Sequence, residues 1–486
     1  MCTDIYIYIS QPDSRGVAIF AFSTATTKVA VSQLSEKIDI MAEHAVQCDN
    51  EFVHSIKTLL WGNTVKKDVF KRWAQGFYFS PDEPTALIQT EGGPCAVIAP
   101  VQAFILKELL SQTDISTWKR INLDNCYQLL VRAFVEILKQ AVDTKAPKFS
   151  VVFTDCKFSN EESGKRGKWM ECVSEISHDG RQIRVGNIAE QDKSKEILPT
   201  EMNEELEEFL SERVDMFKDT YGVLLLLYSA VVTKGVAEIR SEMSDPLESM
   251  IDSTYGYGNQ SLINLMLTGQ AVSHVWDHDQ DVGGLKLRGI NKQNPVGFLA
   301  LLEHLCYCEV GSFLKSPSHP IWVLGSETHL SVLFSTEPRL VSPETPADQA
   351  KRVFRKFDPE GNNFISANSL QDVLAELGLV TDADYVSVMR KKLDNENLGI
   401  ILRASFMDEF FPEEPRTCPD TFPLYHYNGL QHSNPENKVT YHKGQAVLLE
   451  CTIKGIMESN PMLTVLQTKW PRIEIQWDIG QNPSLN

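Results

Sequence analysis

A glycine-rich turn that leads directly into an apolar segment is the feature that most constrains the fold of this chain. It reads Gln-Thr-Glu-Gly-Gly-Pro-Cys-Ala from Gln89 to Ala96. The two glycines let the backbone approach another chain closely, and the proline suits the first turn of a helix, where no N–H is needed. The pattern predicts a helix that begins near Cys95, where unpaired N–H groups would favour a thiolate. Pro100 is expected to kink this helix.

A nucleophilic cysteine needs a base, and His329 has the best setting among the eleven histidines. It follows a Gly-Ser-Glu turn and opens an apolar strand, on which Ser331 shares its face. An early cysteine and a late histidine also match the chain order of papain. Spacing alone leaves two plainer interpretations open, namely a buried cysteine that only packs and a histidine on the surface of a strand.

Composition argues against several classes of function. The 46 Lys and Arg residues against 65 Asp and Glu residues give a net charge of -19, which disfavours binding to nucleic acid or to an anionic membrane. The ten cysteines contain no Cys-x-x-Cys pair, which excludes zinc ribbons and thioredoxin-type motifs and is typical of reduced thiols in the cytosol or nucleus. Residues 222–232, the longest apolar stretch, are too few to span a bilayer and predict a buried core segment. The acidic run at 277–281 has no second His or Cys at ligand spacing, so we expect no metal or other cofactor.

Changes in composition divide the chain into four parts. Residues 1–50 form a strand-like N-terminal extension of unknown role, and residues 51–347 form a first part with long amphipathic segments. Within that part, residues 157–194 are rich in Ser, Gly, Lys and Glu and predict an exposed insertion. Residues 348–412 predict a compact helical block, and residues 413–486 a β-rich part.

The helical block carries two copies of a loop frame that resembles the EF-hand. With Asp358 at position 1 of the first loop, the frame repeats from Asp394, 36 residues later. Calcium loops need a bidentate Glu at position 12, and these positions hold Ser369 and Ser405. We therefore expect an EF-hand-like scaffold that does not bind calcium.

Taken together, these features resemble the MINDY deubiquitinases, a family of papain-like cysteine proteases. The resemblance rests on Gln89 and Cys95 in the glycine-rich turn, on the apolar helix after it, and on His329 at the start of a late strand. It covers residues 52–486, gaps aside, and is closest to the branch of the family that has an EF-hand-like insertion. Further matching runs are Arg72–Phe77, Glu91–Phe104, Gln260–Leu265, Gly325–Leu330 and Tyr425–Leu430.

The resemblance implies an α+β fold, with a papain-like cysteine protease core and an inserted degenerate EF-hand-like helical block. It implies Cys95 as the nucleophile, His329 as the base and Gln89 as a donor to the oxyanion. The expected reaction is hydrolysis of isopeptide bonds in polyubiquitin of the proteasome-targeting linkage type. Ubiquitin and such chains are therefore the expected partners, and the cytoplasm or the nucleus is the expected location.

Two questions stay open at the level of the sequence. No Asn or Asp follows His329 at the distance of a papain triad, and the nearby Ser331 and Glu327 are weak candidates for the residue that orients it. The alternative function is a catalytically inactive adaptor that binds ubiquitin. The presence of the cysteine, the histidine and the glutamine together argues against that alternative, and the missing ligands argue against a calcium sensor.

Overall fold

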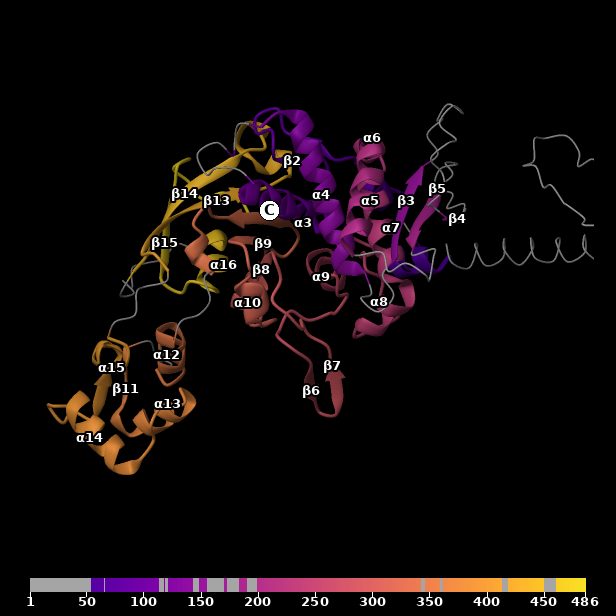
Figure 1. Ribbon diagram of the computed structural model, residues 1–486. Coiled ribbons are helices and arrows are strands. Elements are labelled where there is room, and N and C mark those ends of the chain that lie inside the picture. The colour runs from indigo at the N-terminus through magenta and orange to yellow at the C-terminus, as the bar shows by residue number, and fades with distance from the viewer. Residues whose placement is uncertain are drawn as a thin grey trace, which may run out of the picture. The chain divides into compact units, whose positions relative to one another are not determined.

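A six-stranded sheet carries most of the elements that position the candidate site. Its strand order is β15-β14-β13-β10-β9-β8, with β8 parallel to β9 and the other neighbouring pairs antiparallel (Figure 1). The strands are β8 Gly297–Ala300, β9 Ile321–Gly325, β10 Leu330–Phe334, β13 Thr421–Tyr427, β14 Tyr441–Leu448 and β15 Ile473–Trp477.

The computed structural model describes most of the chain beyond the N-terminal extension. The described residues are 54–64, 66–112, 118, 121–142, 148–154, 170–172, 183–189, 199–341, 346–358, 362–412, 418–449 and 460–486. Those from Ile56 onward belong to one compact unit. The strands expected within residues 1–50 lie outside the described residues.

The strands β9 and β10 form the pair that the sequence predicts on either side of the Gly-Ser-Glu turn. Gly325 at the end of β9 is paired with Leu330 at the start of β10. The strand β10 also pairs with β13, where Val332 lies opposite Tyr427. The helical block falls between these two strands in the sequence, so the β-rich C-terminal part continues the sheet that β9 and β10 begin.

The helix α3 (Cys95–Gln112) packs against β9 and β10 and against the helices α4 (Leu123–Ala141) and α9 (Gln260–Thr268). Its residues are apolar and buried through most of its length, and it continues without interruption through Pro100. Gln102 is a polar residue on this buried helix, and its side chain is fully bonded. It accepts from the backbone N–H of Leu87 at 2.8 Å and donates to the Thr85 carbonyl at 3.0 Å and the Tyr441 hydroxyl at 2.9 Å.

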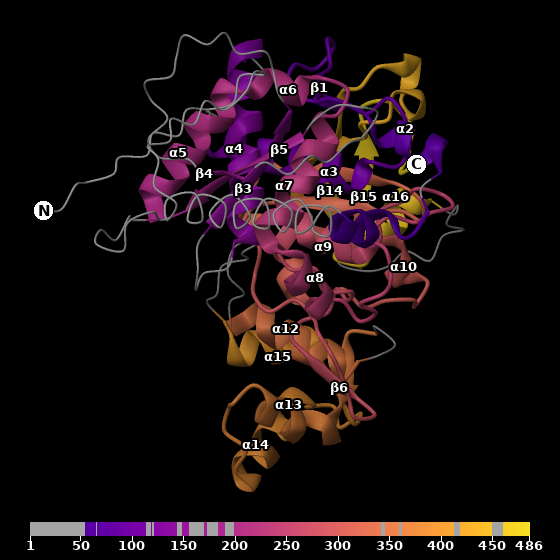
Figure 2. The same ribbon diagram turned by 90° about the vertical axis from the view of Figure 1, so that its right-hand side faces the viewer.

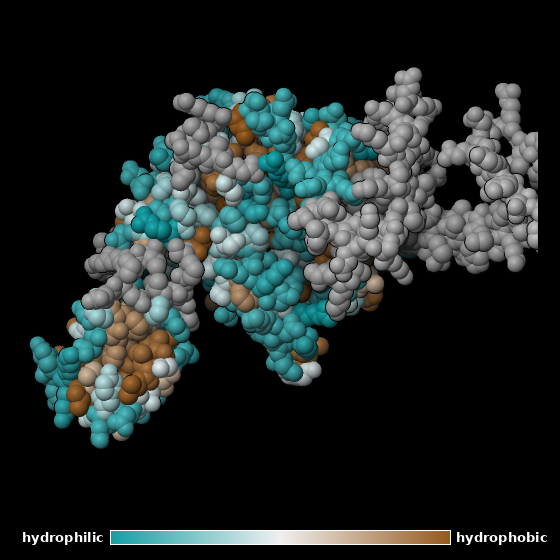
Figure 3. Space-filling view, viewed as in Figure 1, coloured by the Kyte–Doolittle hydropathy of each residue, from teal (hydrophilic) through white to brown (hydrophobic). Residues whose placement is uncertain are grey.

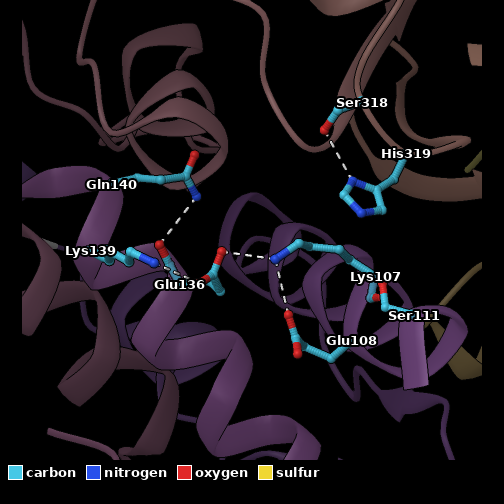
Figure 4. A network of polar contacts seen from close by, with 8 residues as sticks. All are labelled: Lys107, Glu108, Ser111, Glu136, Lys139, Gln140, Ser318 and His319. Carbon is cyan, nitrogen blue, oxygen red and sulfur yellow. Dashed lines mark hydrogen bonds and ion pairs between the residues drawn. The ribbon is translucent and has the colours of Figure 1, made fainter. Parts of the chain in front are cut away.

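A polar network joins α3 to α4 further along both helices (Figure 4). The ammonium group of Lys107 lies 2.9 Å from Glu136 on α4 and 3.0 Å from Glu108 on its own helix. These side chains are largely buried, so the pairing satisfies charges that would otherwise be costly to remove from water. The network fixes the two helices against each other well away from Cys95 at the start of α3.

A second layer of helices packs on a smaller, three-stranded sheet (Figures 1 and 2). The sheet has the order β3-β5-β4, with β3 Lys148–Thr154, β4 Met170–Cys172 and β5 Ile183–Ala189. The helices of the layer that packs on this sheet include α5 (Pro199–Glu212) and α7 (Gly222–Lys234). The predicted insertion at 157–194 thus contributes the strands β4 and β5 to a sheet, and its other residues fall outside the described ranges.

The apolar segment at 222–232 is confirmed as a buried core helix. It forms most of α7, whose residues from Gly222 to Val231 are buried. In the part of the chain that the structure describes, no single helix is long and apolar enough to cross a membrane. The helix α7 and the following α8 (Val236–Glu242), bent by 81° from one another, meet that length and composition criterion only as a pair.

The helical block is built from two helix–strand–helix units. They comprise α12 Pro346–Lys356, β11 Phe364–Ser366 and α13 Leu370–Glu376, then α14 Ala383–Leu393, β12 Ile400–Leu402 and α15 Arg403–Phe410. The strands β11 and β12 pair through Ile365 and Ile401. The block has its own apolar core, which includes Phe354 and Phe406. Figure 3 shows that hydrophobic residues also gather on an exposed face of the block.

The remaining described elements connect these layers. The helices are α2 Lys67–Trp73, α6 Val214–Lys218, α10 Leu301–His304, α11 Ser312–Lys315 and α16 Pro461–Gln467, with 3₁₀ turns η2 Pro338–Val341, η3 Ala367–Ser369, η4 Gln431–Ser433 and η5 Pro435–Asn437. The strands are β1 Tyr78–Phe79, β2 Leu87–Ile88, β6 Gln280–Val282 and β7 Leu285–Leu287.

Candidate active site

Cys95 is the first residue of α3, as the sequence predicts. The turn before it closes on the helix, because the N–H groups of Val97 and Ile98 donate to the Pro94 carbonyl at 2.9 and 3.0 Å. Gly93 has a φ of +126°, and a Cβ at this position would lie only 3.0 Å from the Gly256 carbonyl oxygen. A residue with a side chain would therefore be strained here, which explains the second glycine of the turn.

The surroundings of the Cys95 sulfur correct one expectation from the sequence. Burial raises the pKa of the thiol to about 11, although backbone hydrogen bonds from Leu330 and Ala96 act in the opposite direction. The sulfur itself lies 3.7 Å from the Gly93 carbonyl, to which it donates. The helix terminus is present as predicted, but its effect is smaller than the cost of placing a thiolate in a buried site. Cys95 is thus a neutral thiol in this conformation.

His329 lies directly before β10, and the structure brings it to the same place as Cys95. The residue after it, Leu330, makes the backbone hydrogen bond to the Cys95 sulfur. His329 is buried, and this burial lowers the pKa of its imidazole to about 4, against the opposing effect of a hydrogen bond to Asn428. A nearby His432 lowers the pKa further. The imidazole is therefore neutral and able to accept a proton.

Asn428 is the residue that orients His329, and it is not among the residues predicted from the sequence. Its Oδ1 atom lies 2.9 Å from Nε2 of His329, across 99 residues of sequence. The two weaker candidates do not take this role, because the Ser331 hydroxyl bonds to His426 at 2.9 Å and Glu327 is exposed. The run from Tyr425 to Leu430, which was noted for its family resemblance, contained the missing signal.

The hydrogen bonds of Asn428 also determine which nitrogen of His329 carries the proton. The Oδ1 atom accepts from the Leu430 backbone N–H at 3.0 Å, which identifies that side-chain atom as the oxygen. An amide oxygen can only accept, so Nε2 of His329 must be the N–H donor. Nδ1 is left with a lone pair, and this nitrogen is the one available as a base.

Gln89 is held by the same loop that carries Asn428. Its backbone N–H donates to the Gly429 carbonyl at 2.8 Å, and it forms a parallel bridge with Leu430. Its side-chain amide donates to the Glu91 carbonyl at 2.9 Å, within the turn that leads to Cys95. Gly429 has no room for a side chain, because a Cβ there would lie 2.3 Å from the Tyr427 hydroxyl. One short loop therefore positions both Gln89 and the partner of His329.

These residues make up the set that cysteine hydrolases of the papain type use. A thiol at a helix terminus, a neutral imidazole on the residue before the one whose backbone bonds to the sulfur, and an amide that orients the imidazole suit nucleophilic attack with general-base assistance. Among the described residues, no group of His, Cys, Asp and Glu could hold a metal ion. The acidic run at 277–281 has another task, since Asp277 accepts from the backbone N–H groups of Ser312 and Phe313 at the start of α11.

Comparisons with known proteins point in the same direction. A family model described as "Deubiquitinating enzyme MINDY-3/4, conserved domain" matches residues 57–355, a range that includes Gln89, Cys95 and His329 and ends before Asn428. A Drosophila melanogaster protein, ubiquitin carboxyl-terminal hydrolase MINDY-3 homolog, is 48% identical over 90% of this chain and 84% of its own length. Human ubiquitin carboxyl-terminal hydrolase MINDY-3 is 43% identical over 90% of this chain and 100% of its own length. No solved structure matches.

Proposed function

The chain belongs to the MINDY-3/4 family of deubiquitinating enzymes and is a thiol-dependent ubiquitin hydrolase, and we propose which residues carry the reaction and which chains it cuts. Cys95 is the nucleophile, His329 is the general base, and Gln89 donates to the oxyanion. The substrate is polyubiquitin of the proteasome-targeting linkage type, which the enzyme opens at isopeptide bonds.

The observation that carries this assignment is the meeting of α3 with the start of β10. The Cys95 sulfur bonds to the backbone of Leu330, and the residue before Leu330 is a buried histidine whose Nε2 is engaged by Asn428 at 2.9 Å. A histidine that served only the core would not need a specific tautomer beside a thiol. Here the tautomer leaves Nδ1 free, which is the requirement for a base.

The first half of the reaction forms an acyl-enzyme. Nδ1 of His329 takes the proton of the Cys95 thiol as the sulfur attacks the carbonyl carbon at the C-terminal glycine of ubiquitin. The carbonyl oxygen becomes an oxyanion, which accepts from the Cys95 backbone N–H in the first turn of α3 and from the Gln89 amide. Gln89 leaves its bond to the Glu91 carbonyl to do this. The imidazolium then protonates the lysine amine as the C–N bond breaks.

The second half restores the enzyme. The thioester between Cys95 and ubiquitin is attacked by water, whose proton passes to Nδ1 of His329. The sulfur leaves the carbonyl carbon and takes the proton back from the imidazolium, and ubiquitin departs with a free carboxylate. Asn428 accepts a hydrogen bond from Nε2–H throughout, so it stabilises the imidazolium each time it forms.

The assignment is tested by intact mass spectrometry of the full chain after incubation with ubiquitin that carries a C-terminal electrophile. We expect one adduct on the wild-type protein and none on Cys95→Ala. The matched control is Cys306→Ala, which removes an exposed free thiol and should leave the adduct unchanged. An adduct on Cys95→Ala would refute Cys95 as the nucleophile.

A chain-cleavage assay tests the substrate class and the base. Chains of the proteasome-targeting linkage should be cut faster than chains of the non-degradative signalling type at equal concentration. His329→Ala should lower turnover by several orders of magnitude while binding of the chains persists. Equal cleavage of both chain types would contradict the proposed linkage preference, and near-normal turnover of His329→Ala would contradict its role.

We also propose that the helical block is an EF-hand-like docking module that works without calcium. The carboxylate of Asp358 accepts from the backbone N–H of Asn363 at 2.7 Å, and that of Asp394 accepts from Gly399 at 2.8 Å. Backbone groups of their own loops thus satisfy these carboxylates. The block exposes large apolar side chains, among them Val388 and Leu398, which suits contact with a partner protein.

We propose that the protein works in the cytoplasm or the nucleus. The described cysteines include five free thiols, namely Cys95, Cys126, Cys306, Cys308 and Cys418. Free thiols, one of them exposed and one proposed to be catalytic, suit a reducing compartment. Fractionation of cells that express the tagged chain tests this location, and recovery in a secretory compartment would contradict it.

A further inference from the structure

The segment Ser484–Asn486 lies against the residues that hold His329. The side-chain nitrogen of Asn428 donates to the backbone oxygens of Ser484 at 3.2 Å and of Asn486 at 3.4 Å. These are the two donor bonds of the amide whose oxygen faces His329. Backbone oxygens can only accept hydrogen bonds, so only the NH₂ group of the Asn428 side chain can bond to this segment.

The same segment also reaches the turn that carries His329. The Ser326 hydroxyl bonds to the side-chain Oδ1 of Asn486, and its oxygen accepts from the His329 backbone N–H at 3.0 Å. The backbone N–H of Ser326 in turn donates to the His329 carbonyl at 3.0 Å. Asn486 is thus linked to the backbone of His329 through one side chain and to its imidazole through another.

The segment is anchored rather than loosely placed. Leu485 is only 5% exposed and packs in the apolar cluster that also contains Trp322 and Leu333 of the central sheet. The Ser484 hydroxyl donates to the backbone oxygen of Asn486 at 2.6 Å and accepts from the Asn486 N–H at 3.2 Å, which closes a tight turn around Leu485. The backbone oxygens that face Asn428 therefore have fixed positions.

We propose that Ser484–Asn486 is a positioning segment for His329, which selects the orientation of the Asn428 amide and holds the Ser326 turn. This inference rests on the proposed role of His329 as the base. If the Asn428 amide turned over, its NH₂ group would face Nε2, which would then have to accept. The imidazole would carry its proton on Nδ1, and the nitrogen needed as the base would no longer be free.

The pH dependence of the reaction reports on this positioning. His329 acts as the base in its neutral form, and a correctly placed Asn428 oxygen stabilises its imidazolium. A loosened segment should therefore lower the pKa of the imidazole and move the acidic limb of the activity profile to lower pH. The other titratable groups around His329 are Cys95 on α3, His426 on β13 and His432 on η4, with Glu327 exposed on its own turn. None of them is altered by the substitutions below.

The test compares two substitutions at one position. Asn486→Ala removes one of the two acceptors of the Ser326 hydroxyl, the other being the His329 carbonyl at 3.1 Å, whereas Asn486→Asp keeps an oxygen of the same shape in the same place. We expect kcat on a fluorogenic ubiquitin amide to fall about tenfold in Asn486→Ala with KM unchanged, the loss typical of one hydrogen bond. Asn486→Asp should stay close to wild type. Asn482→Ala, which alters a nearby exposed amide, is the matched control.

Two further variants test the Asn428 branch. Asn428→Asp still accepts from Nε2–H but cannot donate to the backbone oxygens of Ser484 and Asn486, so kcat should again fall about tenfold. Deletion of Ser484–Asn486 removes both branches and should lower kcat by about 10². Since that deletion also removes Leu485 from the core, the Asn486→Ala and Asn486→Asp pair decides the question if the deleted protein does not fold.

The outcomes separate this inference from the proposed function. If the wild-type protein gives no Cys95 adduct with the ubiquitin electrophile, the proposed function fails and this inference fails with it. If wild type reacts but Asn486→Ala keeps the wild-type kcat and acidic limb, only this inference is refuted. An equal loss in Asn486→Ala and Asn486→Asp would also refute it, because the acceptor oxygen would then be irrelevant.

Discussion

The protonation state of Cys95 before ubiquitin binds can be derived from its surroundings. The pKa is about 11 for the thiol and about 4 for His329, a gap of about 7 units. At 1.36 kcal/mol per unit, moving the proton from sulfur to imidazole costs about 10 kcal/mol. Even two unit charges in close contact, about 4 Å apart, would return only about 4 kcal/mol at an effective dielectric constant of about 20. The ion pair is therefore disfavoured by about 6 kcal/mol, or about 10⁴-fold.

A neutral Cys95 thiol should give alkylation of the ubiquitin-free enzyme a characteristic pH dependence. Iodoacetamide reacts with thiolates, and the thiolate fraction of Cys95 should rise about tenfold per pH unit below its pKa. The rate at Cys95, measured by peptide mapping from about pH 6 to about pH 9.5, should therefore climb without a plateau. Cys306, an exposed free thiol, serves as the internal control for reagent access.

The slope distinguishes ionisation from simple obstruction. Burial of the sulfur lowers the rate at every pH by a similar factor, but it does not change the dependence on pH. A rate at Cys95 that is constant from about pH 6 to about pH 8 would show that a thiolate–imidazolium pair already exists. That result would refute the conclusion that burial outweighs the helix terminus in the free enzyme.

Four other outcomes can be checked with standard assays. Gln89→Ala removes an oxyanion donor and should lower kcat about 10²–10³-fold with little change in KM, by steady-state kinetics on a fluorogenic ubiquitin amide. Calorimetry should detect no calcium binding at micromolar concentrations, since both loops lack the bidentate Glu. A variant that begins near Met41 should cleave chains at close to the full-length rate, and a loss of most activity in a folded protein would contradict this. Burial lowers the pKa values of His329 and His426 from 6.5 to about 4 and about 3, so the unfolded chain binds more protons than the folded one below about pH 6.5. The free energy of unfolding should therefore be unaffected by these two groups above about pH 6.5 and should fall as the pH falls. Urea titrations should show a loss of about 4 kcal/mol from them at about pH 5.

The sequence was sufficient to predict those features that depend on residues close together along the chain. A helix start at Cys95 follows from a proline and two glycines, and the β9–β10 pair follows from two apolar runs around a turn. Both predictions are confirmed. The pKa of Cys95 could not be obtained in this way, because it depends on burial against β10, more than two hundred residues away. The expectation of a favoured thiolate considered the helix terminus alone and was wrong for this conformation.

Asn428 escaped prediction for a different physical reason, which concerns the sheet. A search for the partner of His329 at papain spacing assumes a connection of roughly constant length between the two strands involved. Here β10 pairs with β13 in a fixed register, Val332 opposite Tyr427, and the helical block occupies the connection. The register alone places Asn428, one residue beyond β13, level with the start of β10.

An insertion at this point can leave the site intact, because the free-energy cost of closing the loop between two paired strands grows only slowly with the length of the loop. Each doubling of a connecting loop costs only about 0.6 kcal/mol, and the block reduces even this cost because it folds around its own core of residues such as Phe354 and Phe406. The pairing of β10 with β13 and the bond from Gln89 to Gly429 do not depend on what lies between the strands. Distance along the chain is thus a poor guide to the third residue of such a site. The better guide is which strand must lie beside the one that begins at the histidine.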